Sequence, residues 1–160
     1  MMSVDFLSAV AWLMALSSGM MAGVYLAFSS FIMKAFASLG TEAGIDAMNA
    51  INRDILQSLF MPLFFGSTLL SVVLVVVGFW QLPSDRALAA ITAGLIYALG
   101  MFGVTAAGNV PLNNRLDEVS GNSEEAARVW SMYLSKWTRW NSVRTVASIV
   151  TVVLSIYVVQ

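Results

Sequence analysis

Apolar residues along this chain gather into four long blocks, which polar segments separate. The blocks cover roughly residues 6–32, 59–80, 87–107 and 143–159. A helix needs about 20 apolar residues to cross the hydrocarbon core of a bilayer, and the last block is at the short end of that range. The pattern predicts an all-α fold, a single domain over residues 1–160 built as a four-transmembrane-helix bundle. Both chain ends should lie on one side and the two long connections on the other.

The first long connection carries its own helical pattern. Its apolar residues recur at helical spacing between Thr41 and Leu59, which predicts an amphipathic helix that begins after Gly40. Such a helix is expected at the membrane surface or over the mouth of the bundle. The apolar positions are Ile45, Met48, Ile51, Ile55 and Leu59.

The last block belongs to a much longer predicted helix. Ser123 precedes two glutamates, a pattern typical of a helix start, and neither Gly nor Pro interrupts the chain from there to Val159. The sequence therefore predicts one continuous helix of about 36 residues whose first half extends beyond the membrane. Pro111, in contrast, predicts a kink or an end after the third block.

Composition agrees with a membrane protein and excludes several kinds of site. The chain is 59% hydrophobic and 11% charged, whereas soluble domains carry about 25% charged residues. It has no cysteine and no histidine, which excludes disulfides, iron–sulfur clusters, the usual structural zinc sites and histidine-ligated haem. Its methionines are scattered as gap-filling side chains rather than grouped as copper ligands. We expect no metal, no cofactor and no nucleic-acid partner, with the lipid bilayer as the principal partner.

The placement of basic residues predicts the orientation. All of them except Arg86 fall in, or at the edge of, the two long connections. By the positive-inside rule these connections are cytoplasmic and both termini periplasmic, in a bacterial inner membrane. A separate ridge of small residues in the first block lets another helix approach closely. Packing inside the bundle is the favoured interpretation of this ridge, and a homo-oligomer through Gly19 and Gly23 stays open.

Polar residues also gather near the ends of the third and fourth blocks. Trp130, Trp137, Asn141 and Arg144 share one face of the long helix, with Tyr133 beside them. In the third block, Asn109 and Asn113 are four residues apart and would share a helix face. The pattern predicts a polar cluster between two helices. It is either a hydrogen-bonded network that locks the bundle or a pocket for a lipophilic aromatic or quinone-like molecule, and we favour a pocket that does both.

These residues resemble a known family. The segment from Asn109 to Asn113, the two tryptophans, the Asn141–Arg144 segment and the region of Asn52 are similar to the DUF1772 family of small four-span membrane proteins, which includes the anthrone oxygenases of polyketide pathways. The resemblance implies oxidation of an anthrone- or quinol-like compound by O₂ without metal or flavin. It implies an oxyanion-binding cluster of Arg144, Asn141, Asn109 and Asn113, and substrate contacts from Trp137, Trp130, Tyr133 and Asn52.

The general base of such a reaction has no candidate in the sequence. There is no histidine, and no acidic residue falls in the predicted pocket. The alternative function is a non-catalytic membrane protein that binds a lipid, a quinone or a partner membrane protein.

Overall fold

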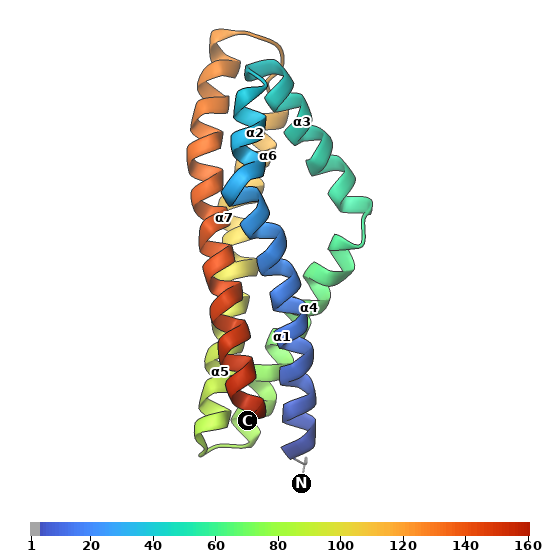
Figure 1. The fold of residues 1–160 in the computed structure, drawn as a ribbon, viewed down its shortest axis with the longest axis vertical. Helices are drawn as coiled ribbons and strands as arrows, with labels where there is room; N and C mark the ends of the chain where they lie inside the picture. The colour runs from blue at the N-terminus through green and yellow to red at the C-terminus, as the bar shows by residue number, and fades with distance from the viewer. Residues whose placement is uncertain (1–3) are drawn as a thin grey trace.

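The computed structural model describes residues 4–160, and within that range it contains helices and no strands. Four helices form the bundle: α1 (Val4–Ala27), α4 (Phe60–Trp80), α5 (Asp85–Tyr97) and α7 (Glu124–Val159). Helix α1 packs on α7, α7 on α5, α5 on α4, and α4 again on α1 (Figure 1). The described part of the chain has four helices long and apolar enough to cross a membrane. The predicted four-helix bundle is confirmed.

The start of α1, the end of α7 and the turn between α4 and α5 lie together at one end of the bundle (Figure 1). The two long connections lie at the other end, as the number of apolar blocks predicts. Helix α7 contains 36 residues without interruption, and the Ser123 Oγ accepts a hydrogen bond of 3.0 Å from the Ala126 N–H. The predicted length and start of this helix are therefore confirmed.

Two of the helices extend beyond their apolar blocks through π-helical turns. Helix α1 continues through η1 (Phe28–Ile32) into α2 (Met33–Ser38). Helix α5 continues through η3 (Ala98–Gly103) and η4 (Thr105–Asn109) into α6 (Val110–Asp117). The helix does not end near Pro111, because η4 accommodates the proline with a wider turn in which the Val110 N–H donates to the Thr105 carbonyl.

The predicted amphipathic helix of the first connection is α3 (Thr41–Asp54), followed by the 3₁₀ turn η2 (Ile55–Gln57). It begins after Gly40, whose φ of 86° lies in the region that favours glycine. From there α3 descends obliquely from the far end of the bundle to the start of α4 (Figure 1). It packs Ile45 and Met48 inward beside Trp130 of α7.

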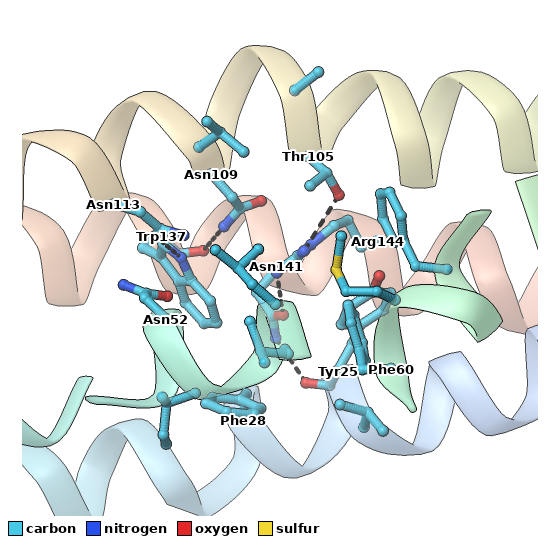
Figure 2. Close-up of a pocket in the computed structure, with 18 of the residues that line it drawn as sticks. Tyr25, Phe28, Asn52, Phe60, Thr105, Asn109, Asn113, Trp137, Asn141 and Arg144 are labelled. Carbon is cyan, nitrogen blue, oxygen red and sulfur yellow. Dashed lines mark hydrogen bonds between the residues drawn. The ribbon is translucent and has the colours of Figure 1, made fainter. Parts of the chain in front are cut away.

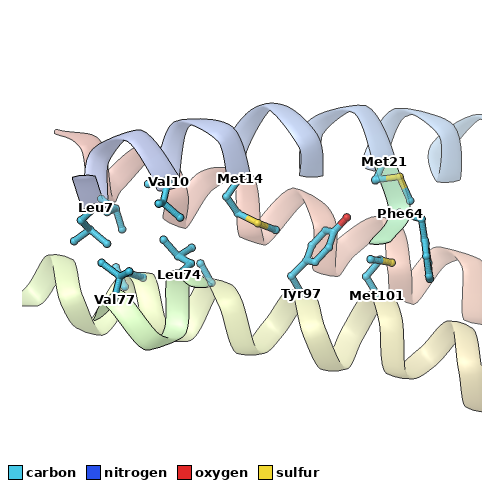
Figure 3. Close-up of a cluster of buried hydrophobic side chains, with 14 of the residues drawn as sticks. Leu7, Val10, Met14, Met21, Phe64, Leu74, Val77, Tyr97 and Met101 are labelled. Atoms are coloured by element: carbon cyan, nitrogen blue, oxygen red, sulfur yellow. The ribbon is translucent and has the colours of Figure 1, made fainter. Parts of the chain in front are cut away.

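Apolar packing holds the bundle on both sides of its middle. Near the chain ends, side chains of α1, α4, α5 and α7 form one buried cluster (Figure 3). A second cluster lies around Trp130 and Tyr133 beneath α3. The ridge of small residues on α1 packs inside the bundle up to Gly19, which faces Val152 of α7. Gly23, the next residue of the ridge, is exposed. The polar site lies between the two clusters.

Candidate functional site

Arg144 is the charged centre of the polar cluster. Its side chain is 5% exposed. One terminal nitrogen, Nη2, donates to Asn141 Oδ1 over 2.7 Å, and Nη1 donates to Thr105 Oγ1 over 3.2 Å (Figure 2). The guanidinium carbon lies 4.2 Å from the centre of the Tyr25 ring and 5.4 Å from the Trp137 ring. Neutral groups thus hold this cation, and among the described side chains, residues 6–160, no carboxylate bonds to it.

Asn141 connects α7 to α1 and orients Arg144. Its Nδ2 donates to the Tyr25 carbonyl oxygen and to Ser29 Oγ, both over 2.6 Å. Its Oδ1 is therefore left to accept from Arg144. Because Asn141 is fully buried, each of these bonds forms away from water, where an unpaired amide would be costly.

The two asparagines of the third span face α7. Asn109 Nδ2 donates to the Trp137 carbonyl oxygen over 3.2 Å. Asn113 Oδ1 accepts from the Tyr133 hydroxyl and from Trp137 Nε1, both over 2.8 Å. Thr105 and Asn109 are the first and last residues of η4, so a π-helical turn presents both side chains to α7. Such turns occur frequently at functional sites.

A cavity of about 320 Å³ opens beside these groups, within the size range of small-molecule sites. It exists because α4 begins only at Phe60, so at this level the end of α3 and the turn η2 form the fourth side of the bundle. Arg144 is the one charged side chain among the described residues that line it. Aromatic side chains form much of its wall, namely Tyr25, Phe28, Phe60, Phe64, Phe65, Phe102 and Trp137.

The mouth of the cavity is apolar. Five residues that line the cavity are also exposed on the outside of the bundle, and none carries a polar side chain. They come from η2, α4 and the α5–α6 helix, so the opening faces sideways between these elements. The five residues are Leu56, Phe65, Phe102, Ala106 and Val110.

Four polar atoms on the cavity-lining residues are buried without a hydrogen-bond partner. They are Tyr25 Oη, Asn52 Nδ2, Asn109 Oδ1 and Arg144 Nε. Most buried polar side-chain atoms in proteins have a partner. Several unpaired donors and acceptors therefore lie on the residues around this one cavity, each closed off from solvent by neighbouring side chains.

A comparison with known families covers the elements that supply most of the cavity lining. The family model described as anthrone oxygenase matches residues 56–154, more than half of the chain. The chain belongs to the anthrone oxygenase family. No curated protein and no solved structure matches it. Family membership and the four apolar helices make this chain a membrane protein of the anthrone oxygenase family, and the resemblance noted from the sequence is confirmed.

Six of the eight predicted site residues of this anthrone oxygenase family member line the cavity: Asn52, Asn109, Asn113, Trp137, Asn141 and Arg144. Trp130 and Tyr133 are not among the lining residues. Trp130 packs against Gly44 of α3. Tyr133 stacks between the two indoles, with ring centres 5.8 Å apart on each side. Trp130 and Tyr133 therefore pack behind Trp137, on the side away from the cavity, and help to hold its ring in place.

Sequence reasoning missed Tyr25, Phe28, Phe60 and Thr105, which all line the cavity. Tyr25 and Phe28 precede the matched region of the anthrone oxygenase family, and nothing in their own block singles them out. The one available signal is that Tyr25 follows Ser18 by seven residues, which places both on one face of α1. Among the described residues, no three His, Cys, Asp or Glu side chains come together as a metal site would require.

Proposed function

We propose that the cavity binds a flat lipophilic aromatic compound as its oxyanion, and that the protein oxidises this anthrone-type compound with O₂ without a cofactor. The observation that carries the proposal is the buried Arg144 guanidinium, which neutral groups hold and which no carboxylate among the described side chains balances. Burying an uncompensated charge costs several kcal/mol. A ligand with an ionised oxygen supplies the missing negative charge inside the cavity.

The remaining lining supports the same class of ligand. Aromatic rings of Phe28, Phe60 and Trp137 offer faces and edges against which a fused-ring system packs. The sideways apolar mouth suits a molecule dissolved in the membrane. Asn52 Nδ2 and Asn109 Oδ1, both unpaired, offer a donor and an acceptor to hydroxyl groups on the ring system.

The chemistry follows from stabilisation of the anion. An anthrone loses one proton of its methylene group to water and becomes an enolate, whose oxygen lies against Arg144. Oriented donors that meet such developing charge in a water-poor site are a large source of catalysis. The enolate carbon then bonds to O₂, the resulting peroxide anion takes up a proton, and loss of water from the hydroperoxide leaves a carbonyl group. One O₂ is consumed and one water is released for each methylene converted.

Oxygen consumption by the purified protein in lipid nanodiscs tests this proposal. An anthrone substrate should produce O₂ uptake and the corresponding quinone well above the rate with empty nanodiscs. The variant Arg144→Met should lose that excess, whereas Arg139→Met, which removes an exposed cation of the same helix, should keep it. Native mass spectrometry of the detergent-purified protein would show binding separately. Binding without O₂ uptake would support the alternative of a non-catalytic binding protein and overturn the oxygenase.

We also propose that the two long connections face the cytoplasm and the termini the periplasm of a bacterial inner membrane. The distribution of basic residues supports this orientation. A reporter fused to the C-terminus should be active only if it folds in the periplasm. Activity of a reporter that functions only in the cytoplasm would reverse the orientation.

A further inference from the structure

Tyr25 differs from the other buried tyrosines in having a hydroxyl group without a partner. Its side chain is 2% exposed and lines the cavity, and its Oη lies near Arg144 and Thr105 without a hydrogen bond of standard geometry to either. In contrast, the Tyr97 hydroxyl donates to Ser67 Oγ and the Tyr133 hydroxyl to Asn113 Oδ1, each over 2.8 Å. A buried hydroxyl that packing alone had selected would more simply be a phenylalanine, because the unpaired oxygen is costly.

The surroundings hold this tyrosine firmly in place. Its carbonyl oxygen accepts from Asn141 Nδ2, and its ring packs edge-on against Phe60 with ring centres 6.4 Å apart. The Arg144 guanidinium lies over the same ring at 4.2 Å (Figure 2). Arg144 Nε is the one guanidinium nitrogen buried without a partner. Two unpaired donors, one a hydroxyl and one a guanidinium N–H, thus belong to side chains in direct contact.

We propose that the Tyr25 hydroxyl donates a hydrogen bond to the same ligand oxygen that Arg144 Nε contacts, so that the two groups form one oxyanion-binding site. This inference rests on the proposed function and adds its second donor. The ligand class that fits is an enolate or phenolate, because one ionised oxygen accepts from both donors at once. No proton is transferred from Tyr25 in this role, and its hydroxyl hydrogen stays on Oη throughout the reaction.

The substitution Tyr25→Phe tests the proposal, with Tyr97→Phe as the matched control. Tyr25→Phe removes an unpaired hydroxyl, so the thermal stability of the ligand-free protein should be unchanged or higher. Loss of one oxyanion donor should lower kcat about 100-fold or more. Tyr97→Phe breaks a buried bond to Ser67 that lies outside the cavity, so it should lower thermal stability and keep kcat within about twofold. Tyr25→Phe is thus expected to change kcat and not thermal stability, and Tyr97→Phe the opposite. This contrast distinguishes a role in ligand binding from a role in packing.

The absorbance spectrum of a bound phenolic ligand gives an independent readout. At a fixed pH, a smaller ionised fraction of the ligand should be seen on Tyr25→Phe than on the wild-type protein, since one donor to the anion is gone. Tyr25→Leu is a second variant without the hydroxyl, and because it also removes the ring beneath Arg144 it should lose at least as much as Tyr25→Phe.

The outcomes distinguish this inference from the proposed function. If Tyr25→Phe keeps the wild-type kcat and ionised fraction while Arg144→Met loses both, the role of Tyr25 is overturned and the proposed function stands. If the wild-type protein neither binds nor oxidises an anthrone-type ligand, both are overturned.

Discussion

Replacement of Arg144 by methionine should separate the stability of the bundle from its affinity for the ligand. The substitution removes two hydrogen bonds, to Asn141 and Thr105, each worth about 0.6 kcal/mol between membrane helices. It also removes cation–π contacts with Tyr25 and Trp137, worth about 1 kcal/mol together. These losses destabilise the variant by about 2 kcal/mol. The variant no longer buries a charge, however, and burying a charge costs several kcal/mol, so this change stabilises it. We therefore expect the thermal midpoint to stay within about 5 °C of the wild type.

The affinity for an anionic ligand should change far more. Two opposite charges about 4 Å apart attract each other by about 4 kcal/mol at an effective dielectric constant near 20. Loss of that attraction corresponds to roughly a 1,000-fold higher Kd. Arg144→Lys keeps the charge but not the planar fork that reaches both partners, so its Kd should fall between those of the wild type and Arg144→Met.

Tryptophan fluorescence measures the binding, because Trp137 lines the cavity and an aromatic ligand beside it should quench its emission. Circular dichroism on the same nanodisc samples measures thermal unfolding. Arg139→Met controls for the loss of a cation from α7, since Arg139 is exposed, and it should bind like the wild type. The reasoning would be refuted by a folded Arg144→Met protein whose Kd lies within threefold of the wild-type value.

Three further predictions follow from the packing. A Cβ at Gly44 would lie 2.6 Å from Trp130 Cζ2 and 2.8 Å from the Phe36 carbonyl oxygen, so Gly44→Ala should lower the unfolding free energy by about 1–3 kcal/mol. Gly66→Ala, with nothing within 4 Å, is the matched control and should not destabilise. Ala106→Trp places a large ring at the cavity mouth and should slow ligand association with little change in thermal midpoint, as stopped-flow fluorescence would show. Ser123→Ala removes the cap of α7 and should lower the unfolding free energy by about 1 kcal/mol without affecting ligand affinity.

The helices could be predicted because their signals are local. The apolar blocks, the spacing of apolar residues in α3 and the Ser123 cap each depend on neighbours a few residues apart. The π-helical turns η1, η3 and η4 left no comparable signal, because they arise where packing and Pro111 widen the helix locally. At Pro111 the sequence therefore predicts a kink or an end, and it does not decide between these and the continuation to Asp117 that the structure shows.

The site could be predicted on α7 and only in part elsewhere. The face that carries Trp137, Asn141 and Arg144 does line the cavity. The same face also carries Trp130, but along 36 residues its neighbours change, and at Trp130 the neighbour is Gly44 of α3. Helical periodicity predicts which residues share a face of a helix. It does not predict which other elements pack against that face.

Tyr25 illustrates the remaining limit. Its contact with Asn141 joins residues 116 positions apart in the chain, and only the folded bundle brings them together. Its unpaired hydroxyl is likewise a property of the packed structure, because the identity of a tyrosine says nothing about whether its oxygen finds a partner.

The affinity of the wild-type protein for a matched pair of ligands tests the central claim most directly. One ligand is an anthrone, which ionises to its enolate, and the other is the methyl ether of its enol form, which has nearly the same shape but cannot ionise. A buried Arg144 that requires an oxyanion predicts that the anthrone binds at least about 10-fold more tightly, since a hydrogen bond to a charged group contributes about 1.5–3 kcal/mol. Equal affinity for the two ligands would show that the cavity selects for shape and apolar surface alone, and would contradict the role assigned to Arg144.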